Sequence, residues 1–172
     1  IGWNFNSGSQ AFNFLPAGQT LTLTYNVRAT DSSGAANNTD NQPVTITITG
    51  TNDGVVANAD TRSIREDESN AANRSGNVLT NDIVDPDLGQ TTSVTGVSLD
   101  HNGDGIPTTY VPTVAGTAVT ITSSGGNLGV FTMFSNGNYS FVPQANYSGP
   151  IPVITYTAGS TGGDSATSTL TL

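Results

Sequence analysis

Polar and apolar side chains alternate strictly through residues 20–29, Thr-Leu-Thr-Leu-Thr-Tyr-Asn-Val-Arg-Ala. Because successive side chains of a β-strand point to opposite faces, this period of two predicts a strand with one buried face. Residues 44–48, Val-Thr-Ile-Thr-Ile, repeat the pattern, and their β-branched side chains oppose a helix. The polar residues 31–43 between them are expected to form a loop. These stretches predict an all-β fold.

Residues 54–172 continue in the same style, with turn signals about every ten residues, as in an all-β sandwich. Asn136-Gly137, between two apolar runs, predicts a type I′ hairpin turn. A short turn at residues 66–72 is the only helical segment expected. The expected strands cover residues 55–59, 63–65, 94–99, 108–111, 118–122, 128–134, 138–142, 153–157 and 167–172. We therefore expect antiparallel β-sandwich modules in tandem, the C-terminal part of one over residues 1–53 and a whole one over residues 54–172.

Composition narrows the functional classes. The chain has 13 acidic residues and four basic ones, all arginine, and its formal net charge is −9. This balance argues against nucleic acids and anionic membrane surfaces, which need a basic patch. No apolar run approaches the roughly 20 residues of a membrane span, so no membrane insertion is expected. Without cysteine or lysine, neither disulfides nor Lys–Asn isopeptide bonds can staple the fold. A bound metal ion is the remaining kind of cross-link that could stabilise the fold.

The acidic residues are concentrated around the expected boundary between the modules. Ten of the 13 fall between Asp53 and Asp104, where the only basic residues are Arg62, Arg65 and Arg74. Ca²⁺ takes about 6–8 oxygen ligands, and such a cluster predicts a Ca²⁺ site at the junction. The alternative is solvated surface acid with local salt bridges to the arginines. The candidate ligands are Asn52 and Asp53 from the linker, Glu66, Asp67, Glu68, Asp85 and Asp87 from the second module, and Asp31 or Asp40 from the first.

Two spacings within this set favour a preformed site. In Asp85-Pro86-Asp87 the proline fixes φ between two carboxylates, which favours a rigid pair over a mobile one. Glu66 and Glu68 are alternate residues, so they would share a side if their segment were extended.

A second Ca²⁺ site is suggested by Asp100-His-Asn-Gly-Asp-Gly105, which has the Asp-x-Asn-x-Asp-Gly opening of an EF-hand loop. Its ligands would be Asp100, Asn102 and Asp104. The loop lacks the bidentate Glu at its twelfth position, where Val111 stands. A polar β-turn held by Asx-turn hydrogen bonds is the equal alternative.

Enzymatic activity is not expected. His101 is the only histidine, and a neighbouring Asp on a turn does not set up a catalytic relay. Glu66 and Asp85 could be drawn as a glycosidase pair, but only 7% of the residues are aromatic, too few to line a sugar cleft.

Several stretches resemble repeats of large bacterial adhesins. Residues 15–31, Leu-Pro-Ala-Gly-Gln-Thr-Leu-Thr-Leu-Thr-Tyr-Asn-Val-Arg-Ala-Thr-Asp, and residues 44–53, ending in Gly-Thr-Asn-Asp, resemble the second half of VCBS-type repeats. Residues 77–87, Asn-Val-Leu-Thr-Asn-Asp-Ile-Val-Asp-Pro-Asp, with Val-Thr-Gly-Val at 94–97, resemble the opening of bacterial cadherin-like tandem repeats. Residues 137–149, Gly-Asn-Tyr-Ser-Phe-Val-Pro-Gln-Ala-Asn-Tyr-Ser-Gly, resemble their closing hairpin.

The resemblance implies an Ig- or cadherin-like extender region of an RTX-type adhesin, secreted to the bacterial cell surface, in which Ca²⁺ at domain junctions rigidifies the stalk. It would contact neighbouring repeats of the same polypeptide and support cell adhesion or biofilm formation. The sequence departs from the family pattern in its acidic loop at residues 100–105. With the polar residues 123–127, this loop supports a rival hypothesis, a Ca²⁺-dependent domain that binds a cell-surface glycan or peptide.

Overall fold

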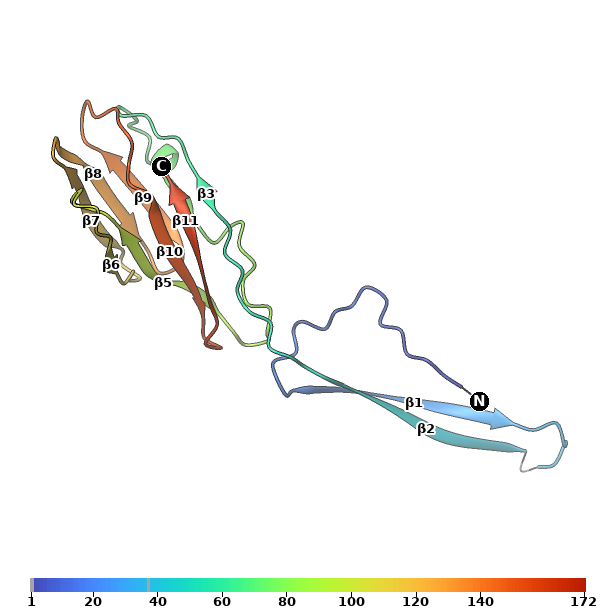
Figure 1. Ribbon diagram of the computed structural model, residues 1–172. Helices are drawn as coiled ribbons and strands as arrows, with labels where there is room; N and C mark the ends of the chain where they lie inside the picture. The colour runs from blue at the N-terminus through green and yellow to red at the C-terminus, as the bar shows by residue number, and fades with distance from the viewer. Residues whose placement is uncertain (1, 37) are drawn as a thin grey trace. The chain divides into compact units, whose positions relative to one another are not determined.

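The computed structural model describes residues 2–36 and 38–172 (Figure 1). The chain divides into two compact units, Ile1–Asp53 and Gly54–Leu172. The all-β prediction is confirmed, because the described residues form β-strands and one four-residue 3₁₀ helix. Within these described ranges, no helix has the length and apolar character needed to cross a membrane.

The first unit is built on one long antiparallel hairpin. Its strands are β1 (Thr20–Thr30) and β2 (Thr39–Thr49), which pair from Thr20 opposite Thr49 to Thr30 opposite Thr39. The strands expected at residues 20–29 and 44–48 are confirmed. The loop between them is shorter than predicted, because residues 39–43 extend β2. These five residues are all exposed, so pairing with β1 rather than burial of a face accounts for their extended conformation.

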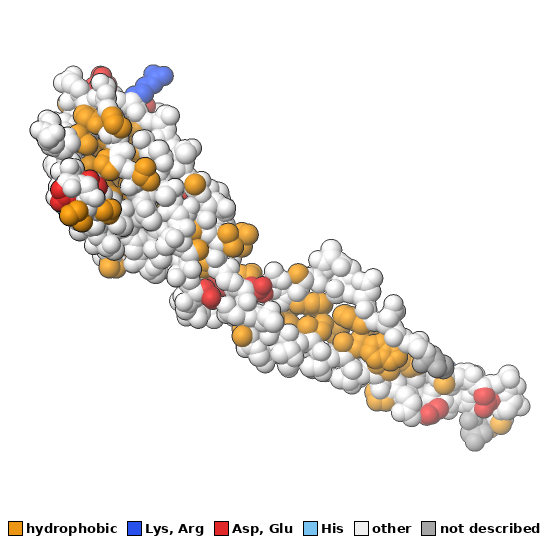
Figure 2. Space-filling model, in the orientation of Figure 1, with side chains coloured by type: hydrophobic (Ala, Val, Ile, Leu, Met, Phe, Trp, Pro, Cys, Tyr) orange, Lys and Arg blue, Asp and Glu red, His pale blue; other side chains and the backbone are white. Residues whose placement is uncertain are grey.

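Little of the first unit is buried. Among its described residues, Leu15 is the only buried hydrophobic side chain. Tyr25 and Val27 are half exposed on the hairpin, and apolar side chains gather on the visible face of the unit (Figure 2). An isolated two-stranded hairpin is only marginally stable in water. The first unit therefore lacks the core that would hold its strands together.

We expect this difference to be visible in amide hydrogen exchange of the full chain. Amides of β1 and β2 should exchange through low-energy local openings, since few apolar contacts oppose them. Amides in the buried strands of the second unit should exchange only on global unfolding. Equal protection of the two sets, measured by mass spectrometry or NMR, would contradict this expectation.

The second unit contains nine strands in two sheets. One sheet has the order β3-β11-β10-β5-β6 and the other β4-β9-β8-β7, consistent with a β-sandwich (Figure 1). The strands are β3 (Asp60–Thr61), β4 (Ser75–Asn77), β5 (Thr92–Leu99), β6 (Thr108–Tyr110), β7 (Thr117–Ser123), β8 (Gly126–Met133), β9 (Asn138–Pro143), β10 (Ile154–Ser160) and β11 (Ser165–Thr171). The pairings are antiparallel except for β3, which runs parallel to β11.

A single core lies in this unit and draws on both sheets. Alternate residues of β7, β9 and β10 point inward, so their burial follows the period of two expected from the sequence. In β5 and β8 a shift of register interrupts this period. The largest fully buried side chains are Tyr156, Phe131, Leu99, Ile121, Met133, Ile154, Leu170, Val78, Val94 and Val97.

The start of this unit is less regular than predicted. Neither of the strands expected at residues 55–59 and 63–65 forms. The region has a bridge between Val56 and Ile83 and the two-residue β3, which lies between the two predicted ranges. The helical segment begins later than expected, as η1 (Ala71–Arg74). Asn70 explains this position, because its side chain accepts a hydrogen bond from Ala72 N at 3.0 Å and caps the helix.

The predicted type I′ turn at Asn136-Gly137 is wrong. Gly137 N donates to Phe134 O at 3.0 Å, and Phe134 N donates to Asn138 O at 2.8 Å. Only Gly137 in this loop has positive φ, whereas type I′ requires it at both central residues. The loop is therefore a tight turn followed by a left-handed glycine, the common three-residue hairpin. The Asn-Gly pair fits both loop types.

Gly137→Ala is expected to lower the free energy of unfolding by about 1–3 kcal/mol. The residue has φ of +86°, and an added Cβ would lie 2.7 Å from both Asn77 Oδ1 and Leu79 Cγ. Gly105→Ala is the matched control, since Gly105 has φ of +83° with nothing within 4 Å of an added Cβ. Denaturant titration should show a larger loss for Gly137→Ala, and equal losses would exclude the steric contribution.

Candidate functional site

Asp85 and Asp87 are the buried charged side chains of the described chain, with 7% and 4% of their surfaces exposed. They lie in the loop that leads into β5. Asp85 Oδ1 accepts from Asp87 N at 2.9 Å, and Asp85 Oδ2 accepts from the Ser160 hydroxyl. Asp85 N donates to Thr92 Oγ1 at 3.0 Å. The Asp85 carboxylate is thus held in place by the loop itself and by the end of β10.

The turn between β10 and β11 forms the other wall of this Asp85–Asp87 site. Thr161 Oγ1 donates to Gln90 Oε1 at 2.7 Å and accepts from Thr91 N at 3.0 Å. Gly162 lies against the site, since an added Cβ there would be 3.4 Å from Asp85 Oδ2. Asp164 belongs to the same turn, and its carbonyl accepts from Ser160 N.

The arginines of this unit lie elsewhere. Arg62 donates to the carbonyls of Ala72 and Asn73, and Arg65 and Arg74 act electrostatically on Glu68. These residues lie beyond the end of β3, away from the turn that contacts Asp85. The guanidinium groups therefore do not supply the positive charge that two buried carboxylates call for.

The oxygen atoms around Asp85 and Asp87 are suitable ligands for a hard cation. A carboxylate offers about four acceptor positions, and Asp85 uses two of them in the bonds given above. The surrounding groups are hydroxyl and amide oxygens, the ligand type that Ca²⁺ takes. Within residues 2–36 and 38–172, no three His, Cys, Asp or Glu side chains come close enough to hold a metal by themselves. An ion at this site would also need carbonyl, hydroxyl or water oxygens.

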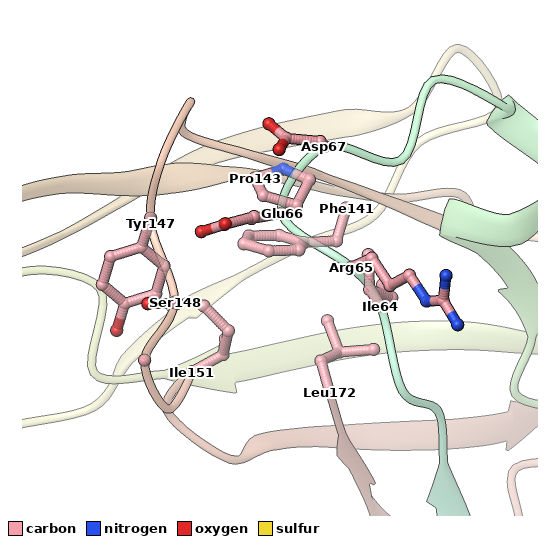
Figure 3. Close-up of a pocket in the computed structure, with 11 residues that line it drawn as sticks. Ile64, Arg65, Glu66, Asp67, Phe141, Pro143, Tyr147, Ser148, Ile151 and Leu172 are labelled. Carbon is pink, nitrogen blue, oxygen red and sulfur yellow. The ribbon is translucent and has the colours of Figure 1, made fainter.

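Glu66 and Asp67 lie at the opposite end of the unit. They line a surface cavity of about 550 Å³ with Phe141, Tyr147 and other residues (Figure 3). Figure 3 shows the Glu66 side chain directed toward Tyr147, while the Arg65 guanidinium points away.

The extended segment in which Glu66 and Glu68 would share a side does not form. Glu68 N donates to Arg65 O at 3.2 Å, so the segment is a turn rather than an extended strand. Glu68 instead accepts from Asn70 N and from Asn73 Nδ2 at 2.8 and 2.9 Å. These hydrogen bonds hold the pKa of Glu68 below its ordinary value.

The carboxylates of the second unit therefore cannot serve one site. Asp85 lies against the turn that precedes β11, whereas the cavity at Glu66 includes Leu172, which follows β11. The seven residues of β11 separate these ends by about 20 Å at the usual rise per residue. The prediction that Glu66, Asp67 and Glu68 join Asp85 and Asp87 is thus corrected, and the glycosidase pairing of Glu66 with Asp85 is excluded.

In the first unit, the prediction that Asp31 or Asp40 joins Asn52 and Asp53 in one site is also corrected. They lie at the tip of the hairpin, whereas Asn52 and Asp53 follow β2 at its other end. Strands of 11 residues place the two ends roughly 35 Å apart. Asp31 is exposed and accepts from Ser33 N at 2.8 Å, and Ser33 holds the pKa of Asp31 below its ordinary value.

The acidic loop at residues 100–105 is held by its own hydrogen bonds. Asp100 accepts from the backbone N of Gly103 and Gly105 at 2.8 and 2.9 Å. Asp104 accepts from Asn102 Nδ2 at 2.8 Å and from Ile106 N at 2.7 Å. The Asn102 side chain and the Ile106 backbone N lower the pKa of Asp104. The geometry matches the β-turn alternative, and it leaves the second Ca²⁺ site a prediction.

The two loops of the rival hypothesis do lie together. An added Cβ on Gly103 would be 3.2 Å from Ser123 Cα, and Thr122 N donates to His101 O at 2.6 Å. The His101 ring packs edge-on against Tyr110, with 5.8 Å between ring centroids.

The sequence did not reveal which distant residues meet Asp85, or that two aspartates meet near Tyr156. Ser160 lies 75 positions from its partner Asp85, and no local pattern marks it. Asp60 and Asp82 were visible as acidic residues, but nothing in the sequence indicated that both meet Tyr156.

No family model, curated protein or solved structure matches the chain. The resemblance to adhesin repeats therefore stays a prediction based on the quoted motifs.

Proposed function

We propose that this chain is a Ca²⁺-stabilised extender and adhesion segment of a large secreted bacterial surface adhesin, built from Ig- or cadherin-like sandwich modules in tandem. The observation that carries the proposal is the pair of buried carboxylates at Asp85 and Asp87. The excess of acidic over basic residues and the absence of cysteine and lysine add support.

The proposed mechanism is neutralisation of buried charge. Asp85 and Asp87 would be ligands of the ion, and Ser160 and Thr92 would keep the Asp85 loop in its binding conformation. When bound, Ca²⁺ would offset the repulsion between the carboxylates. Because the unfolded chain has no such arrangement, ion binding would add to folding stability. An extender that folds on meeting extracellular Ca²⁺ would stiffen the stalk for cell adhesion or biofilm formation.

Thermal unfolding of the full chain with Ca²⁺ or with EDTA tests this function. At a Ca²⁺ concentration a hundred times the dissociation constant, the gain in stability is about 2.7 kcal/mol, so the midpoint should rise by several degrees. Mg²⁺ at the same concentration should do less, because it requires a smaller octahedral site. An unchanged midpoint in EDTA would refute the metal role.

A second candidate function is direct binding of a glycan or peptide at the other end of this unit. The adjacency of Gly103 and Ser123 and the cavity beside Glu66 favour it. Glycan and peptide arrays probed with the full chain test this alternative. Reproducible Ca²⁺-dependent hits, lost on replacement of residues 123–127, would favour a binding domain, and silence on both arrays would favour the extender.

A further inference from the structure

A buried hydroxyl in the second unit is surrounded by more acceptors than it can serve. Tyr156 on β10 is fully buried, and its hydroxyl oxygen lies 2.8 Å from Asn58 O and 3.2 Å from Val78 O. The two carboxylate oxygens of Asp82 lie 3.1 and 3.0 Å away. A phenol carries a single proton. Burial and the Asp82 carboxylate raise the pKa of Tyr156, so this proton stays on the phenol.

Asp60 brings a second carboxyl group to the same place. It lies at the start of β3, two residues after Asn58, and close enough to Tyr156 for the phenol to act on its pKa. Its Oδ2 atom is buried without a hydrogen-bond partner. Arg62, two residues away, directs its guanidinium to the carbonyls of Ala72 and Asn73. The cluster of Asp60, Asp82 and Tyr156 therefore lacks a donor for at least one carboxyl oxygen.

We propose that Asp60 and Asp82 share one proton beside the Tyr156 hydroxyl, and that this proton locks residues 55–61 onto the sandwich. Asp60 is the carboxylic acid that donates, Asp82 is the carboxylate, and the proton comes from solvent. Two carboxyl groups in one site favour such an arrangement, because both cannot ionise without repulsion.

Asp82 and its neighbour Asn81 hold residues 55–61 in place through hydrogen bonds. Asp82 Oδ1 accepts from Asn58 N at 2.7 Å. Asn58 Nδ2 donates to Asn81 O at 2.7 Å, and Asn81 Nδ2 donates to Ala59 O at 3.1 Å. Loss of the shared proton would place two negative charges where these bonds converge.

The pH window follows from the surrounding groups. Burial, and next the Asp82 charge, raise the pKa of Asp60 to about 6 from 3.8, against the lowering effect of the Tyr156 hydrogen bond. The folded state thus binds the proton more tightly than the unfolded state. The stabilisation is complete below pH 3.8 and is lost as the pH rises through about 6. Tyr139 and Tyr156, whose pKa values are raised, stay neutral in this window.

Carbon-13 NMR titration of the aspartate carboxyl groups, on the full chain in EDTA, tests the lock. The Asp60 resonance should titrate near pH 6, and D82N should lower that midpoint because it removes the neighbouring negative charge. D60N places an amide donor where the proton lies. Its thermal midpoint should therefore lack the rise expected of the unmodified chain between pH 7 and pH 5. D67N, which replaces an exposed carboxylate of the same unit, is the control and should keep that rise.

Three outcomes would overturn the proposal. Titration of Asp60 near pH 4 would exclude a shared proton, and this measurement needs no variant to fold. A D60N profile parallel to that of the unmodified chain would exclude Asp60 as the group responsible. Suppression of the Asp60 titration by added Ca²⁺ alone, absent in D82N, would show that the pair holds a cation instead.

Discussion

D85N/D87N, the double replacement of the buried carboxylates, is expected to abolish stabilisation by Ca²⁺ while the second unit stays folded. Asparagine keeps the shape of each side chain and an oxygen that accepts from Asp87 N or the Ser160 hydroxyl. It removes the two negative charges that would bind the ion. We expect calcium affinity, measured by isothermal titration calorimetry, to fall at least about a hundredfold, which corresponds to about 2.8 kcal/mol.

A second result is expected for the stability of this variant in EDTA. Removing two buried negative charges should leave stability unchanged or raised, since burial of charge is costly. D40N, which removes an exposed carboxylate from the first unit, is the control and should keep the calcium response. A double variant with the full calcium response would show that the ion binds elsewhere.

Phe131→Ala is expected to cause the largest loss of stability, about 3–5 kcal/mol. Phe131 is 0% exposed in the middle of β8, and it lies opposite Phe141 on β9 and Val119 on β7. Truncation would leave a cavity at the centre of the single core. Urea titration of the second-unit transition measures the loss.

Val142→Ala is the matched control for this truncation. Val142 neighbours Phe141 on β9 but is 45% exposed on the outer face of the sheet. This variant should lose less than about 1 kcal/mol of unfolding free energy, because less apolar surface is removed from the protein interior. Similar losses in the two variants would contradict the position of the core.

The fold was predictable wherever one face of a strand is buried. The alternation at residues 118–122 and 138–142 comes from inward-facing residues such as Ile121 and Phe141, so strand type and position followed from the pattern. Residues 39–43 and β4 showed no such pattern, because pairing with a neighbouring strand rather than burial keeps them extended.

The candidate site was predictable in part. Asp85-Pro86-Asp87 is a local signal, and the structure holds this pair together in one loop. The wider ligand set failed because a sequence cluster says nothing about which end of a strand each residue reaches. Glu66 lies only 19 positions before Asp85, yet the direction of β3 beside β11 carries it to the opposite end of the unit.

The parallel pairing of β3 with β11 also decides how the second unit would bear a pulling force. Asp60 lies opposite Leu170, Thr61 lies opposite Thr171, and Arg62 N donates to Thr171 O at 2.9 Å. Tension applied before β3 and after β11 would slide these two strands past each other, so their hydrogen bonds would be loaded together in shear. In an antiparallel terminal pair pulled from one end, the bonds would open one at a time. Tension on these two ends would thus load β3 in shear, beside the carboxyl pair of Asp60 and Asp82.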